Sequence, residues 1–232
     1  MGNLRILLLS GGTYHNFDGF EASIRPLLKD HGHQLDATYD LDMLLTLDQR
    51  RYDLVINNTC LGKHRPDHDD TSQERMTDAQ TEALVAFVRS GGGYLPFHSA
   101  TVSGEPDPKL AQLNGAVFVE HPPSHTFAVY PMRLEHPITK DIEAFCVRDE
   151  LYMQAYNEDV VVLMVAIDRG VAYPMVWTRQ EEKGRVGHIA LGHTSDVWQS
   201  TPFQKLFLQT IDWLAPSHDE SPTSLGDAVI YL

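Results

Sequence analysis

The chain has 232 residues, of which 42% are hydrophobic and 22% are charged. This apolar content is enough to form a packed core, which excludes disorder for most of the chain. Asp and Glu number 32 against 18 Lys and Arg, giving a formal net charge of −14. Because so acidic a surface repels nucleic-acid phosphates and anionic lipids, we expect neither nucleic acid nor membrane as a partner. No apolar run approaches the roughly 18 residues that span a bilayer.

The chemistry available to the chain is that of imidazole and carboxylate, because it contains 12 His but only 2 Cys. Cys60 and Cys146 form no Cys-x-x-Cys pattern, so neither a disulfide framework nor a Cys-based zinc site is predicted. We interpret both as buried, reduced thiols of a cytoplasmic protein. The N-terminal apolar run Ile6–Leu9 is too short for a signal peptide and indicates a buried strand.

The first half of the chain alternates between apolar runs and amphipathic segments. Four segments are predicted to be strands: Arg5–Ser10, Gln34–Tyr39, Tyr52–Asn57 and Tyr94–Phe97. Apolar residues at helical spacing predict two helices, Asp18–Asp30 and Asp78–Arg89. This β-α-β-β-α-β order, with uninterrupted apolar strands, predicts a parallel sheet covered by helices on both faces.

The second half is richer in strands, and we expect antiparallel additions to the sheet there. The predicted strands are Thr126–Met132, Glu150–Tyr156, Val160–Ile167, Met175–Thr178 and Val186–Leu191, and the last helix is Phe203–Leu214. Residues 1–215 are expected to form one α/β domain and residues 216–232 a flexible C-terminal tail. The tail ends in an apolar segment, Ala228–Leu232, which suggests docking on the body or on another subunit of a homo-oligomer.

Histidines follow three of the predicted strands. His15 comes after the first strand and a Gly11-Gly12 turn, His98 after the fourth, and His193 after the last. In a parallel α/β sheet, ligands bind at the carboxyl ends of the strands, so these side chains are expected at one rim. Imidazole serves there either as a metal ligand or as a general acid or base. The alternative is that all three are capping or core residues.

Other residues can extend this rim. His121 can reach it from a proline-rich loop, and Glu150 can orient a rim histidine or act as a base. Ser99, beside His98 in a strand-to-turn segment, is a candidate nucleophile, although no Gly-x-Ser-x-Gly motif surrounds it. Trp198 lies a few residues after His193 and can stack on a sugar ring at the same rim.

The remaining sequence patterns do not indicate a binding or catalytic role. The Gly11-Gly12 turn lacks both glycine-rich phosphate-binding motifs, so no nucleotide is expected. Of the other histidines, His136 is interpreted as structural. Six are interpreted as surface residues: His31, His33, His64, His68, His188 and His218.

Seven segments, in this order, resemble the ThuA-like (trehalose utilisation) family of the class I glutamine amidotransferase-like superfamily. They are Gly11-Gly12 with His15, Gly92 through Ala100, Glu120-His121, His136–Ile138, Asp149–Tyr152, Pro174–Trp177, and Gly184 through His193. The resemblance covers Leu4 to Leu214. It implies a three-layer flavodoxin-like fold. It does not imply glutamine hydrolysis, because His98-Ser99 stands where the amidotransferases carry a catalytic cysteine.

The resemblance also implies a role in sugar catabolism, where partner dehydrogenases form keto derivatives of sugars such as trehalose. We therefore expect an enzyme acting on a 3-keto sugar or glycoside by elimination, isomerisation or hydrolysis. His98 or Glu150 would be its base. Substrate-binding residues would be Gly12, His15, Tyr152 and Trp198. A divalent metal (Zn, Mn or Fe) held by His15, His98, His121 and His193 would assist, with metal-free acid–base catalysis as the alternative. Two other hypotheses are a non-catalytic sugar-binding or regulatory module and a hydrolase using Ser99.

Overall fold

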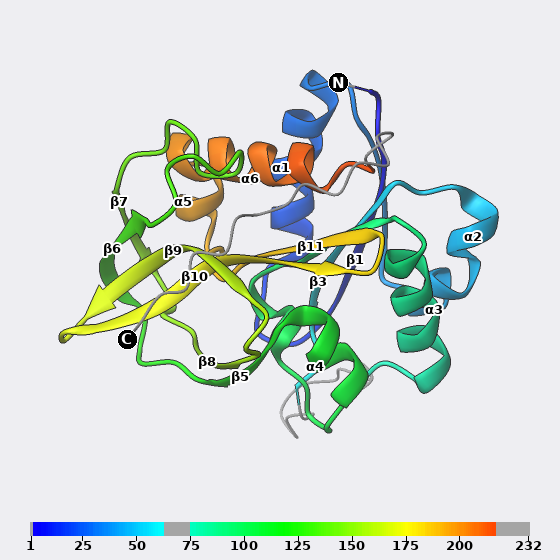
Figure 1. Ribbon diagram of the computed structural model, residues 1–232, viewed down its shortest axis with the longest axis horizontal. Coiled ribbons are helices and arrows are strands. Elements are labelled where there is room, and N and C mark those ends of the chain that lie inside the picture. The colour runs from blue at the N-terminus through cyan, green and yellow to red at the C-terminus, as the bar shows by residue number, and fades with distance from the viewer. Residues whose placement is uncertain (1, 63–74, 217–232) are drawn as a thin grey trace.

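The computed structural model describes residues 2–62 and 75–216, and its centre is a nine-stranded mixed β-sheet (Figure 1). The strands are β1 (Arg5–Gly12), β2 (Gln34–Thr38), β3 (Leu54–Cys60), β4 (Gly93–Pro96), β5 (Ala116–Glu120), β6 (His125–Pro131), β7 (Phe145–Asp149), β8 (Met153–Tyr156), β9 (Val161–Asp168), β10 (Val171–Glu181) and β11 (Gly184–Ile189). The α-helices are α1 (Phe17–Asp30), α2 (Leu47–Arg50), α3 (Asp78–Arg89), α4 (Pro108–Asn114), α5 (Ser195–Trp198) and α6 (Thr201–Leu214). Two 3-10 helices are η1 (Leu41–Thr46) and η2 (His98–Thr101).

The predicted parallel part of the sheet is confirmed. Its strand order is β2-β1-β3-β4-β11, and each neighbouring pair is parallel. Alternate residues of β1 point to opposite faces, as the period of two in a strand requires. Ile6 and Leu8 pack in a core cluster with residues of α1 and α6, whereas Leu7 and Leu9 pack in a second cluster with residues of α3 and α4. The sheet is therefore the middle of three layers.

The predicted antiparallel additions are also confirmed. The sheet continues from β11 through β10, β9, β6 and β7, and every one of these pairs is antiparallel. Strands β5 and β8 form a separate antiparallel pair. None of the helices within residues 2–62 and 75–216 is long and apolar enough to cross a membrane.

Several boundaries differ from those predicted. The structure contains α4, β5 and β7 and four short helices that apolar periodicity does not predict. The expected strand Glu150–Tyr156 is wrong at its start: β7 ends at Asp149, and β8 begins only at Met153. The intervening residues leave the sheet, which turns Glu150 toward the histidines. Cys60 is buried as expected, but Cys146 is exposed, so the prediction of burial is wrong for Cys146. The predicted linker and docking segment after residue 216 lie outside the described residues.

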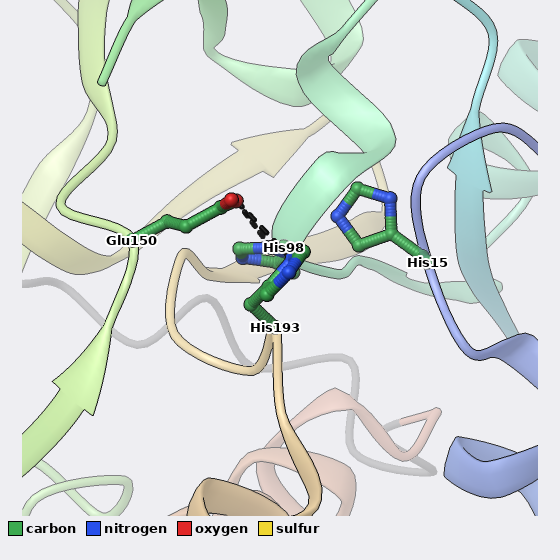
Figure 2. A group of neighbouring side chains, drawn as sticks. All are labelled: His15, His98, Glu150 and His193. Atoms are coloured by element: carbon green, nitrogen blue, oxygen red, sulfur yellow. Dashed lines mark ion pairs between the residues drawn. The ribbon is translucent and has the colours of Figure 1, made fainter. Parts of the chain in front are cut away.

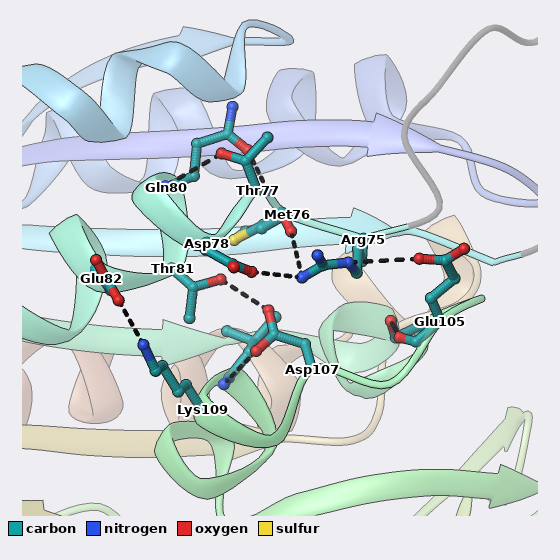
Figure 3. Close-up of polar contacts among 12 residues, drawn as sticks. Arg75, Met76, Thr77, Asp78, Gln80, Thr81, Glu82, Glu105, Asp107 and Lys109 are labelled. Carbon is teal, nitrogen blue, oxygen red and sulfur yellow. Dashed lines mark hydrogen bonds and ion pairs between the residues drawn. The ribbon is translucent and has the colours of Figure 1, made fainter.

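Polar contacts fasten α3 to the segment that leads from η2 into α4 (Figure 3). Thr77 and Gln80 form a capping box at the start of α3, which satisfies the free amides of its first turn. The Thr81 hydroxyl donates to Asp107 Oδ2 at 2.7 Å, and Arg75 pairs with Glu105 at 3.4 Å. These contacts hold the segment that follows His98 in the chain.

A glycine allows β1 and β3 to approach closely at their carboxyl ends. A methyl group on Gly12 would lie 2.0 Å from the carbonyl oxygen of Cys60, and the Gly12 φ is +102°. Gly12→Ala is therefore expected to lower the free energy of unfolding by about 2–4 kcal/mol in denaturant titrations. Gly32→Ala is the matched control, because Gly32 also has a positive φ but open space around it; we expect a loss of only about 1 kcal/mol. Equal losses in the two variants would contradict this explanation.

Candidate functional site

Four side chains from distant parts of the chain converge at the carboxyl ends of the parallel strands (Figure 2). They are His15, His98, Glu150 and His193, and one ligand atom of each lies within 4.8 Å of the others. His15 follows β1, His98 follows β4 and His193 follows β11. The structure thus brings the three strand-end histidines together, as the topology predicts. Glu150 comes from the antiparallel part of the sheet, directly after β7.

His98 occupies a sharp turn between β4 and η2. Its φ is +43°, a left-handed conformation that costs a non-glycine residue about 1 kcal/mol or more. Its side chain is fully buried. Nδ1 lies 2.6 Å from the carbonyl oxygen of Ala190, so this nitrogen carries the proton and donates. In the neutral ring Nε2 then carries the lone pair, and this nitrogen points toward Glu150 Oε2 at 3.6 Å.

His15 is held in the same way. Its Nδ1 donates to the carbonyl oxygen of Thr13 at 2.9 Å, which leaves the lone pair on Nε2. Burial, followed by the neighbouring His98, lowers the pKa of His15 to about 3. The imidazole is therefore neutral at pH 7, the state in which it binds a metal ion.

His193 is positioned by a carboxylate at the end of β7. The two oxygens of Asp149 accept hydrogen bonds from the backbone amides of Gly192 (2.7 Å) and His193 (3.1 Å). The fully buried Asp149 thereby joins the antiparallel part of the sheet to the loop after β11. His193 Nδ1 lies 3.2 Å from Glu150 Oε2.

Glu150 stands at the centre of the group. Besides His98 and His193, it faces His121, whose Nε2 lies 3.7 Å from Oε1. Burial alone would raise the pKa of Glu150, but contact with His98 and the nearby His193 and His121 outweighs it and lowers the pKa to about 2. The group is therefore a carboxylate at neutral pH. The ring of Tyr152 stacks between His98 and His121, with centroid distances of 4.4 and 5.4 Å.

The donor set has the chemistry of a metal site. Within this group, three buried ring nitrogens have no hydrogen-bond partner among the described residues: His15 Nε2, His98 Nε2 and His193 Nδ1. Buried polar atoms are rarely left unpaired, because each loses its hydration without compensation. Three imidazole lone pairs and one carboxylate are ligands that suit Zn²⁺, Mn²⁺ or Fe²⁺. The residues thus fit a divalent cation.

Three other residues predicted for the site lie outside the four-residue group. His121 lies outside the four-residue group, although it contacts Glu150. Ser99 is fully buried, and its hydroxyl has no partner among the described residues. Trp198 is only 4% exposed, and its indole N–H donates to the carbonyl oxygen of Gly192 at 2.5 Å. Its ring therefore supports the His193 loop and offers no face to a sugar.

Two histidines predicted to lie at the surface are buried, so that prediction is wrong for them. His188 is fully buried and stacks on Trp177 at a centroid distance of 3.9 Å. His33 is buried and accepts a hydrogen bond from the backbone amide of Leu4. Sequence reasoning also missed the positioning role of Asp149. Its only sequence signal is an acidic residue directly before Glu150.

Removing the Asp149 carboxylate is expected to weaken metal binding without removing a ligand. Asp149→Asn replaces one of the two acceptor oxygens with an N–H₂ group, which faces a backbone N–H of Gly192 or His193 and cannot accept its hydrogen bond. The loop that carries His193 is then no longer held in one position. We expect metal affinity to fall about 10- to 100-fold, as for other residues that orient metal ligands. Titration with Zn²⁺ against a competing chelator measures this. Unchanged affinity in a folded variant would show that Asp149 does not position His193.

Comparisons with solved structures identify the fold. A ThuA-like protein from Parabacteroides merdae is 19% identical, with a TM-score of 0.75 over 96% of this chain and 94% of that one. A ThuA-like protein from Bacteroides uniformis is also 19% identical, with a TM-score of 0.69 over 91% of each chain. A beta-galactosidase from Rahnella sp. R3 is 14% identical, with a TM-score of 0.65 over 91% of this chain but 31% of its own. At these identities the likeness shows the fold alone.

A comparison with curated proteins finds no match. The family comparison is more informative, because one family model, ThuA, described as trehalose utilisation, matches residues 5–214. This range contains all four residues of the convergent group and nearly all of the described structure. The chain therefore belongs to the ThuA family.

Proposed function

We propose that this protein is an enzyme of carbohydrate catabolism that uses a divalent metal held by His15, His98, His193 and Glu150. The observation that carries the proposal is the convergence on one ionised carboxylate of three imidazole nitrogens that have no hydrogen-bond partner in residues 2–62 and 75–216. A binding module has no need of such a donor set. Membership of the trehalose utilisation family supports a sugar as the substrate.

The substrate class that suits this site is a neutral 3-keto sugar or glycoside, formed by a sugar dehydrogenase. A ketone acidifies the neighbouring C–H bond, so a base can remove that proton. A bound divalent cation supplies Lewis acidity, which stabilises negative charge developing on the carbonyl oxygen. The three-layer flavodoxin-like classification belongs to the same proposal, because the order β2-β1-β3-β4-β11 corresponds to the doubly wound order of that fold.

Within this proposal, His121 moves the proton. His98 and Glu150, the bases expected from the sequence, belong to the group that we propose as the metal ligands. His121 lies beside that group and is partly exposed, so it is accessible to a substrate. Its Nδ1 donates to the carbonyl oxygen of Pro122 at 2.9 Å, so Nε2 carries the lone pair when the ring is neutral. Stacking on Tyr152 fixes the plane of the ring.

A serine hydrolase receives less support. Such an enzyme needs a base within hydrogen-bond reach of the nucleophile. The Ser99 hydroxyl is buried and has no such partner among the described residues.

Metal content is the first test. Protein purified without a His tag is expected to retain about one equivalent of Zn, Mn or Fe, measured by inductively coupled plasma mass spectrometry. The double variant His98→Ala/His193→Ala is expected to lose it, because half of the ligands are gone. His125→Ala is the control, because His125 is the first residue of β6 and lies outside the group. Its Nε2 lies 3.8 Å from Asp168 Oδ1. Metal retained equally in all three proteins would refute the assignment of the ligands.

The role of His121 makes a separate prediction. His121→Ala is expected to lower kcat on 3-ketotrehalose by about 10²- to 10⁴-fold, the usual contribution of a general acid or base. Metal content should stay at the wild-type level, because His121 is outside the donor set. Steady-state assays on metal-loaded proteins, with His125→Ala again as control, measure the effect. Full turnover by His121→Ala would assign the proton transfer to another group.

A further inference from the structure

An exposed tyrosine stands at the same sheet edge as the histidines. Tyr39 directly follows β2, whose last residue, Thr38, pairs with Leu9 of β1. His15 follows β1, so both residues leave the carboxyl ends of neighbouring parallel strands. The ring of Phe17 connects them, with centroids 5.9 Å from the His15 ring and 6.4 Å from the Tyr39 ring. Tyr39 is therefore separated from the imidazole group by a single aromatic ring.

Tyr39 is held in place although it is exposed. Its side chain is 55% exposed, and its hydroxyl donates to Asp18 Oδ1 at 2.5 Å. The ring also lies beside the backbone of Gly11, where an added methyl group would be 3.7 Å from the ring carbon Cδ1. A large aromatic side chain that is both oriented and open to solvent offers a ready contact surface for a ligand.

A second exposed tyrosine borders the group. Tyr14 directly precedes His15 in the chain and is 53% exposed. Its φ is +68°, a left-handed conformation that costs a non-glycine residue about 1 kcal/mol or more. Such strain is concentrated at functional positions, because elsewhere a less strained arrangement is available.

The charge around Tyr39 selects among ligands. Burial raises the pKa of the Tyr39 hydroxyl to about 12, with further contributions from its hydrogen bond to Asp18 and from the charges of Asp18 and Glu21. Glu21 is paired with the Arg25 guanidinium, so Asp18 is the carboxylate that accepts hydrogen bonds from hydroxyl groups and repels phosphates and carboxylates here. An aromatic face beside hydrogen-bond acceptors suits the apolar face and the hydroxyl rim of an uncharged sugar ring.

We infer that Tyr39, oriented by Asp18, forms a second subsite that binds the distal ring of a neutral glycoside while its keto ring lies at the histidine group. This inference rests on the function proposed above. The substrate is then an uncharged glycoside with at least two rings, rather than a monosaccharide or a sugar phosphate. In this inference Tyr39, which follows β2, stacks on the sugar in place of Trp198. Trp198 comes after β11, at the other end of the parallel part of the sheet.

Calorimetric titration of the metal-loaded, full-length protein tests this subsite. The ligands are trehalose, glucose and trehalose 6-phosphate, and the proteins are wild type, Tyr39→Ala, Tyr39→Phe and Tyr130→Ala. Tyr130 is the matched control because it is an exposed tyrosine on β6, away from the rim. We expect wild type to bind trehalose more tightly than glucose or trehalose 6-phosphate. Tyr39→Ala should weaken trehalose binding about 3- to 10-fold, the range for an aromatic contact, and leave glucose binding unchanged.

Tyr39→Phe keeps the ring and should retain most of the affinity, and Tyr130→Ala should behave as wild type. Wild-type affinity for trehalose in Tyr39→Ala would overturn the inference, as would equal losses for trehalose and glucose. Tight binding of trehalose 6-phosphate would overturn the selection for neutral ligands. Turnover of 3-ketotrehalose by wild type is measured separately. Trehalose binding through Tyr39 without any turnover would keep the subsite and refute the enzymatic proposal.

Discussion

The structure of this site depends on how each imidazole is held. His15 and His98 each donate the Nδ1 proton to a backbone carbonyl at a strand end, so their Nε2 lone pairs face inward. Those carbonyls belong to Thr13 and Ala190, within the loops that end β1 and β11. The ligand geometry is thus set by the backbone that directly follows two strands of the sheet. Side chains placed in this way are pre-organised for a ligand and need little reordering to bind one.

The two halves of the sheet must meet for the site to form. The parallel half supplies the histidines, and the antiparallel half supplies Glu150 and Asp149. Asp149 accepts hydrogen bonds from the backbone amides of Gly192 and His193, so the carboxyl end of β7 is joined directly to the loop that carries His193. Its amide–carboxylate bonds are charge-assisted and buried, which makes them stronger than ordinary surface contacts. Metal binding and the packing of the antiparallel half are therefore expected to be coupled.

The sequence predicts the parallel half well, because β1, β3 and β4 are apolar runs that only a doubly covered sheet can bury. It also predicts which histidines meet, because topology places the strand ends together. It predicts that Glu150 can orient a rim histidine, but not that Glu150 faces His98, His121 and His193 together. That arrangement depends on how the antiparallel strands return to the rim. His188 shows a related limit. A histidine within an apolar strand suggests that the strand is partly exposed, and only the structure reveals that the His188 ring is buried against Trp177. For Trp198, proximity in sequence gave no information on which way the indole points.

The central claim is that the histidine–glutamate group binds a metal ion. X-ray diffraction at the zinc absorption edge, from crystals of the untagged protein grown with Zn²⁺, tests it most directly. The account predicts one strong anomalous peak among His15, His98, Glu150 and His193 that is absent from His98→Ala/His193→Ala crystals. A wild-type map with no peak at this group, or with its strongest peak beside His125 and Asp168, would contradict it.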